Sequence, residues 1–141
     1  MKTLTTISGL LLLAVFSATI ALADPNGLDG AWSGSSESIY PTGDRVTGVL
    51  FDGIIYQESG SGLFYGEFTY TLAGVGSFAG FVTGYMDRGG TLTGLLSLDL
   101  GNDEIKAVAT VEGQLTGNKI FAVTRDFSDG TTSILTAYRV R

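Results

Sequence analysis

From Gly30 onward the chain consists of short runs in which apolar and polar residues alternate, separated by clusters of Gly, Asp, Asn and Ser. Alternation with a period of two is typical of half-buried β-strands, and no stretch there keeps the 3.6-residue period of an amphipathic helix. The pattern predicts eight strands, at about residues 30–39, 45–57, 62–73, 76–86, 91–100, 104–115, 118–127 and 130–140. The links between them are short and rich in residues that tolerate positive φ, as hairpin turns require.

Short links make successive strands antiparallel neighbours, because a parallel connection needs a crossover of a dozen or more residues. A meander of eight strands leaves two exposed edges unless the first strand pairs with the last. We therefore predict an all-β fold, an eight-stranded antiparallel up-and-down barrel whose interior is filled by side chains or holds one small ligand. A two-sheet sandwich is the alternative, although its Greek-key connections are normally longer.

The alternation also assigns faces to the strands. In residues 62–73 it places Phe64, Phe68 and Tyr70 on one face and Glu67 on the other, and in residues 104–115 the apolar face comprises Ile105, Ala107, Ala109, Val111 and Leu115. A charged face turned toward lipid would be costly, so we expect the apolar faces to point inward and no membrane insertion. Glycine recurs inside the strands, which we interpret as bending of a tightly coiled sheet, with close approach of a ligand as the alternative.

Residues 1–23 have the features of an export signal. Lys2 provides the positive charge, residues 10–16 form an unbroken apolar run, and Ala21 and Ala23 provide a small-x-small cleavage site. A membrane anchor is the alternative, but this run is too short for a hydrocarbon core about 30 Å thick. We predict cleavage after Ala23 and a single domain, residues 24–141, in the periplasm or outside the cell.

The charge and the missing residue types restrict the possible functions. The chain has 14 Asp and Glu against 8 Lys and Arg, a net charge of −6, which disfavours nucleic acid as a partner. It contains no His and no Cys, so the familiar catalytic triads cannot form. Residues 24–30 suggest a calcium loop, but the spacing of the ligands is wrong and Ser35 occupies the twelfth position. We expect no metal and no cofactor, and we interpret Asp126 and Asp129 as residues of a hairpin turn.

The aromatic residues are more informative. Most must fill the core, but a buried tyrosine hydroxyl needs a hydrogen-bonding partner. We predict that four aromatic residues on apolar stripes line a ligand cavity: Tyr56, Phe68, Tyr70 and Tyr138. Residues 45–57, 76–86 and 118–127 are apolar on both faces, which predicts an outer self-association surface and a homodimer. An error in the assumed strand register is the alternative explanation.

The sequence Gly30-Ala31-Trp32 at the start of the first strand, with Arg139 near the end of the last, resembles the calycin superfamily. That superfamily includes lipocalins, fatty-acid-binding proteins and avidins, in which a Gly-x-Trp enters the barrel and a late basic residue packs over it. The resemblance implies a barrel that binds a small molecule. It does not imply biotin, because Trp32 is the only tryptophan and avidins use several.

Counting strands leads to the same pair. With an even number of strands in a meander, the last strand ends beside the start of the first, so Trp32 and Arg139 should share one rim. We expect an arginine within about 6 Å of the indole ring, where a cation–π contact forms. Alternation along the last strand, in which Ile134, Thr136 and Tyr138 form the apolar stripe, places Arg139 on the opposite face. Arg141 is therefore the alternative partner.

We predict from these features a binding protein that holds a small, largely apolar ligand in its lumen. One alternative is a cofactor-free isomerase or cyclase, similar in outline to barrels of the allene-oxide-cyclase type, with Glu67 pointing inward to the substrate. Another is a structural or interaction protein that uses its outer surface.

Overall fold

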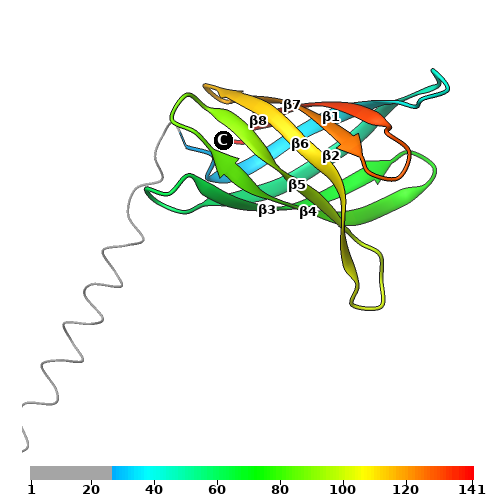
Figure 1. The fold of residues 1–141 in the computed structure, drawn as a ribbon, viewed down its shortest axis with the longest axis horizontal. Helices are drawn as coiled ribbons and strands as arrows, with labels where there is room; N and C mark the ends of the chain where they lie inside the picture. The colour runs from blue at the N-terminus through cyan, green and yellow to red at the C-terminus, as the bar shows by residue number, and fades with distance from the viewer. Residues whose placement is uncertain (1–26) are drawn as a thin grey trace, which may run out of the picture.

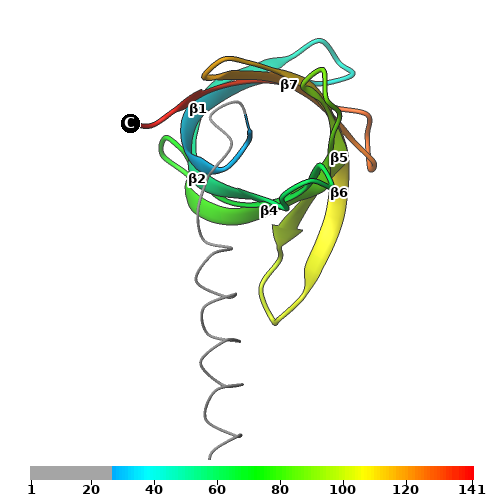
Figure 2. The same ribbon diagram turned by 90° about the vertical axis from the view of Figure 1, so that its left-hand side faces the viewer.

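A computed structural model describes residues 27–141 as eight antiparallel strands that close into a barrel (Figure 1). The strands are β1 (Gly30–Ile39), β2 (Arg45–Gln57), β3 (Leu63–Leu72), β4 (Gly76–Met86), β5 (Thr91–Asp99), β6 (Ile105–Thr116), β7 (Lys119–Asp126) and β8 (Thr132–Arg139). Each strand pairs with the next and β8 pairs with β1, so the sheet has no free edge, as Figure 2 shows. The predicted barrel is confirmed in place of the sandwich. The predicted signal and its cleavage after Ala23 lie outside the described residues.

The meander divides the links between two ends of the barrel. One end, here called the mouth end, carries the links at residues 40–44, 73–75, 100–104 and 127–131. The other, here called the terminal end, carries the links at residues 58–62, 87–90 and 117–118, together with the start of β1 and the end of β8. The hairpin of β5 and β6 projects beyond the barrel wall (Figure 1). Within residues 27–141, no helix is long and apolar enough to cross a membrane.

Glycines make room for the inward aromatic rings. A Cβ atom added to Gly53 would lie 2.2 Å from Cδ1 of Phe68, its partner on β3, and 2.3 Å from the carbonyl oxygen of Glu67. The same relation, in which a ring occupies the space that a side chain would fill, holds for Phe51 at Gly34, Phe64 at Gly84 and Tyr70 at Gly80. These glycines therefore allow large rings to fill a narrow, tightly coiled barrel.

A β-bulge changes the predicted face of part of β6. Leu96 pairs with Ala109 but Ser97 pairs with Ala107, so Val108 is the extra residue. Because one inserted residue exchanges the two faces of a strand, Ile105 is 61% exposed and Ala107 is exposed as well. The prediction that both lie on the inner face is wrong, whereas it is correct for Ala109, Val111 and Leu115.

The inner face of β8 is also the reverse of the one predicted. Leu135 and Ala137 line the interior and Tyr138 is exposed. Both faces of this strand are apolar, so alternation alone did not distinguish them. The pairing of Trp32 with Arg139 across β1 and β8 fixes the register.

Candidate functional site

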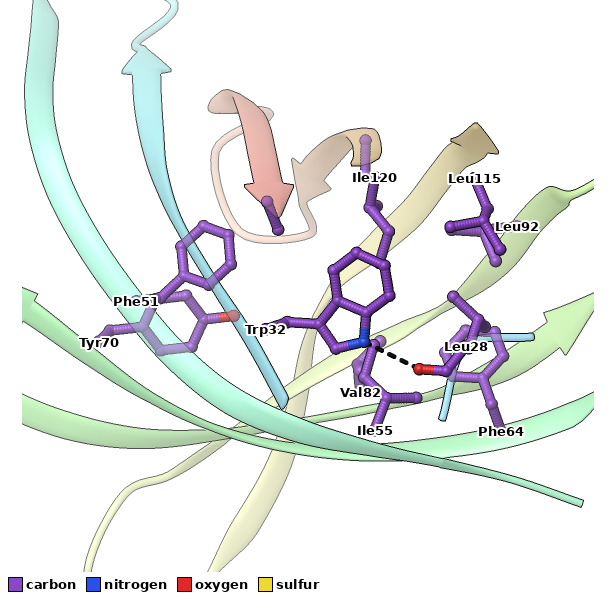
Figure 3. Close-up of a cluster of buried hydrophobic side chains, with 12 residues drawn as sticks. Leu28, Trp32, Phe51, Ile55, Phe64, Tyr70, Val82, Leu92, Leu115 and Ile120 are labelled. Carbon is purple, nitrogen blue, oxygen red and sulfur yellow. Dashed lines mark hydrogen bonds between the residues drawn. The ribbon is translucent and has the colours of Figure 1, made fainter. Parts of the chain in front are cut away.

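The start of the described chain closes the terminal end of the barrel. Leu28 is fully buried and Trp32 is 1% exposed, and the segment before β1 turns across the opening (Figure 2). The Trp32 Nε1–H donates a 2.8 Å hydrogen bond to the Leu28 carbonyl oxygen, drawn in Figure 3. The Leu28 amide donates to Gln57 Oε1 at 2.8 Å, and the Gln57 amide donates to Asp29 Oδ1 at 2.5 Å. These bonds fix the segment to the end of β2.

Arg139 completes this closure. Its guanidinium carbon lies 4.6 Å from the centroid of the Trp32 ring, inside the distance expected from the sequence for a cation–π contact. Its two terminal nitrogens donate hydrogen bonds to the carbonyl oxygens of Asp29 and Gly27. Leu28, Trp32 and Arg139 together are called the plug below. Arg139, and not the alternative Arg141, is therefore the arginine that packs on the Trp32 ring.

Beyond the plug lies a small inner cavity of about 70 Å³. Its walls are almost wholly apolar and include Phe51, Ile55, Val82, Leu92 and Ala122. This volume holds a few water-sized molecules, whereas pockets for drug-sized ligands measure roughly 300–1,000 Å³. The inner cavity alone is therefore too small for such a ligand.

A larger cavity, of about 310 Å³, opens at the mouth end and is called the mouth cavity. Its apolar lining includes Val49, Leu72, Phe78 and Leu98. Its other lining residues include Tyr40, Tyr70, Ser36, Ser38, Thr124, Asp126, Asp129, Thr131 and Ser133. Tyr70, Leu96, Thr124 and Leu135 line both cavities, so the two adjoin along the lumen. The barrel is thus closed at one end and hollow toward the other.

Tyr70 is the most deeply buried hydroxyl-bearing aromatic residue of the mouth cavity. It is 8% exposed, and its ring stacks on Phe78 with centroids 5.5 Å apart. Burial raises the pKa of Tyr70 to about 12, and no hydrogen bond joins its hydroxyl to another residue in the described part of the chain. Figure 3 shows the side chain directed into the buried cluster. Because this hydroxyl has no protein partner among the described residues, it can hydrogen-bond a polar atom of a ligand in the lumen.

Two carboxylates lie at the mouth. Asp126 continues the inner stripe of β7 that begins with Ile120, Ala122 and Thr124, and it is half-buried. Its Oδ1 accepts hydrogen bonds from the Ser128 amide at 2.7 Å and the Ser128 hydroxyl at 2.5 Å.

Asp129 Oδ1 likewise accepts a 2.7 Å bond from the Thr131 amide. Both aspartates therefore form the turn, as predicted, but they also line the mouth cavity. The sequence reasoning missed this second role, although the alternation along β7 carries the signal for Asp126. Within residues 27–141, no three potential ligands from His, Cys, Asp and Glu gather as a metal site.

The structure separates the four aromatic residues that the sequence brought together. Phe68 and Tyr70 lie in the lumen lining. Tyr56 and Tyr138 are 54% and 56% exposed, so the prediction that they face the cavity is wrong. Both belong to strands with two apolar faces, where alternation gives no direction. Glu67 is exposed and accepts a 2.5 Å hydrogen bond from the Tyr65 hydroxyl, so it does not point inward as the isomerase hypothesis required.

The outer wall carries a row of aromatic residues across β2, β3 and β4. Tyr56 and Tyr65 stack with centroids 6.3 Å apart, and Tyr65 and Phe81 stack at 6.4 Å. Four further apolar residues on these strands and on the neighbouring β5 are more than two-fifths exposed: Ile54, Leu63, Tyr85 and Leu95. Exposed apolar residues therefore cover β2 and β4, as expected, and also β3 and β5, with Glu67 among them, and self-association through this surface stays a prediction.

Comparison with known proteins identifies the fold alone. No family model matches the chain, and no curated protein matches it. Among solved structures, a redesigned beta barrel, b11L5F_LGL, superposes with a TM-score of 0.57 at 16% identity, covering 81% of this chain and 92% of that one. Rv2717c from M. tuberculosis superposes with a TM-score of 0.50 at 15% identity, covering 86% of this chain and all 100% of that one. At these identities the shared feature is a small β-barrel.

Proposed function

We propose that this protein is an exported barrel that binds a small, largely apolar ligand in its lumen, with the mouth cavity as the site. The observation that carries the proposal is a lumen closed by the plug at one end and open at the other to a cavity of about 310 Å³. The resemblance of Gly30, Trp32 and Arg139 to the calycin pattern supports small-ligand binding. Export is supported by the sequence of residues 1–23.

The lining of the mouth cavity supplies the two components of such binding. Phe78, Leu72 and Leu98 remove apolar ligand surface from water, which contributes about 25 cal/mol for each Å² buried. The unpartnered Tyr70 hydroxyl supplies an oriented hydrogen bond. Since the cavity is at the lower limit of the range for drug-sized ligands, the ligand is compact, of the size of an eight-carbon chain rather than a long acyl chain.

The isomerase or cyclase alternative is less well supported. It depended on Glu67 as an inward carboxylate, and Glu67 lies on the outer wall. A binding site needs only the cavity and its polar groups, both of which the lumen provides. We therefore favour binding over catalysis.

Calorimetric titration of the mature protein with octan-1-ol tests the proposal. We expect saturable binding of one molecule, together with a change in fluorescence of Trp32, which as the only tryptophan reports on the base of the lumen. Ser133 lines the mouth cavity, so Ser133→Phe should block ligand entry. Thr132→Phe is the control, because Thr132 precedes Ser133 in β8 but does not line the cavity. The absence of saturable binding, or equal binding by the two variants, would overturn the proposal. Export is checked separately by the mass of the secreted chain, which should begin at Asp24.

A further inference from the structure

We infer that the ligand of the lumen is a compact apolar amine, whose ammonium group is held at the mouth by Asp126 and Asp129. This inference rests on the proposed function and specifies the ligand class for the same site. An anionic ligand such as a short fatty acid is the class that it excludes.

The first support is the position of Asp126. It follows Ala122 and Thr124 on the inner stripe of β7, is half-buried and lines the mouth cavity. Its turn bonds use Oδ1, which leaves Oδ2 to accept a further hydrogen bond. Asp129 is exposed in the turn, and its Oδ1 likewise accepts a hydrogen bond, from the Thr131 amide.

The second support is the supply of acceptors for an ammonium group, which has three N–H donors and no acceptor. The two carboxylates provide charged acceptors, which make the stronger class of hydrogen bond. The Thr131 hydroxyl oxygen has almost no accessible surface, so the acceptors that a ligand can reach are the two carboxylates. An amine placed here would pair with both.

The third support is the Tyr70 hydroxyl, which is independent of the carboxylates. The Tyr70 residue is 8% exposed and lines both cavities, and its hydroxyl has no protein partner among the described residues. A hydroxyl of this kind inside a hollow lumen can hydrogen-bond a ligand that enters. The lumen therefore favours a ligand that carries a polar group over a pure hydrocarbon.

The charge around the mouth favours a cation. Among the described residues, no Lys or Arg lines the mouth cavity or the inner cavity. Arg125, next to Asp126 in β7, is exposed on the outer wall, and Arg45 is engaged by Glu37 at 3.1 Å. The remaining links of the mouth end add three acidic residues, Asp44, Asp103 and Glu104, and Lys106 at the start of β6 is exposed outside the cavity wall. An anionic head group would therefore meet like charges with no compensating cation in the cavity wall, and a cation would be attracted to the entrance.

The test compares three probes with the same eight-carbon chain: octylamine, octan-1-ol and octanoate, titrated calorimetrically at neutral pH and low ionic strength. We expect octylamine to bind about tenfold more tightly than octan-1-ol and octanoate to bind most weakly, since about 1.4 kcal/mol corresponds to tenfold. Asp126→Asn should reduce the affinity for octylamine about tenfold and leave that for octan-1-ol within about twofold. Asparagine keeps an Oδ1 that accepts the turn bond, and circular dichroism verifies the fold.

Asp99→Asn is the matched control. Asp99 also lies at the mouth end and its Oδ1 also accepts a turn amide, that of Gly101 at 2.8 Å, but it does not line the mouth cavity. It should change none of the three affinities by more than about twofold. Equal effects of the two variants on octylamine affinity, or octanoate binding as tightly as octylamine, would overturn the inference. The proposed function would still stand in that case, provided that octan-1-ol binds. Binding of none of the three probes would overturn both.

Discussion

Replacing Arg139 by alanine should destabilise the barrel by about 3 kcal/mol, because three interactions of the plug are lost together. The guanidinium lies 4.6 Å from the Trp32 ring, and such cation–π contacts contribute about 0.5–2 kcal/mol. Its hydrogen bonds to the carbonyl oxygens of Asp29 and Gly27 would each contribute about 1.5–3 kcal/mol if buried. They lie at a half-buried rim where water replaces part of each bond, so we count about 1 kcal/mol for each.

The assay is thermal and urea unfolding followed by circular dichroism and by the emission of Trp32. For a domain of this size, a loss of about 3 kcal/mol lowers the Tm by about 10 °C. The emission of the folded variant should shift to the red, since Trp32 is 1% exposed only while the plug is intact. Arg139→Lys should recover only part of the loss, because an ammonium group lacks the planar fork that reaches two carbonyls and stacks on an indole.

Arg125→Ala is the control for removing a positive charge, because Arg125 is exposed on the outer face of β7. It should change the unfolding free energy by less than about 0.5 kcal/mol. If the Arg139 and Arg125 variants lose equal stability and the Trp32 emission stays in place, Arg139 does not close the barrel and the reasoning fails.

Four further predictions concern the lumen, the wall and the outer surface. Tyr70→Phe removes a lumen hydroxyl that bonds to no other described residue, so octan-1-ol should bind more weakly while the unfolding free energy at neutral pH changes by less than about 1 kcal/mol. An unchanged affinity for octan-1-ol would contradict this. Burial raises the pKa of Tyr70 from 10.0 to about 12, so the folded state keeps a proton that the unfolded chain releases, and stability present below pH 10 is lost as the pH rises toward 12. Tyr70→Phe should remove about 1 kcal/mol per pH unit from that decline between about pH 10.5 and 11.5, and an unchanged slope in urea titrations over that range would refute burial as the cause. Gly53→Ala places a Cβ 2.2 Å from the Phe68 ring and should lower the unfolding free energy by about 3 kcal/mol in urea titrations. Gly89→Ala is the control and should be nearly neutral, because its Cβ meets only the Asp87 carboxylate, at 3.2 Å. Similar losses of stability in the two variants would argue against a role for glycine in ring packing. The mature chain should form dimers through the outer aromatic row of Tyr56, Tyr65 and Phe81, and Tyr65→Asp should shift the equilibrium to the monomer. A monomeric mass for the unaltered chain in sedimentation equilibrium would exclude this association.

The strands and their closure were determined by local features of the sequence. Residues 62–73 alternate cleanly between apolar and polar positions, and the turn residues on either side allow only short antiparallel connections, so β3 and its faces were predictable. The number of strands then placed Trp32 beside Arg139, because an even meander returns to its starting rim. These inferences succeed because pleat and turn geometry depend on neighbours in the sequence.

The site depended on contacts between strands that the sequence does not encode locally. Tyr56 and Tyr138 lie on strands that are apolar on both faces, and only pairing around the closed ring turned them outward. The bulge at Val108 exchanged the faces at the start of β6, which alternation alone could not reveal. The size of the lumen was decided in the same way, because it is the small volume left after aromatic rings from one strand fill the spaces above glycines of the next. Such a volume depends on how side chains from all eight strands fit together, and it exists only once the barrel has closed.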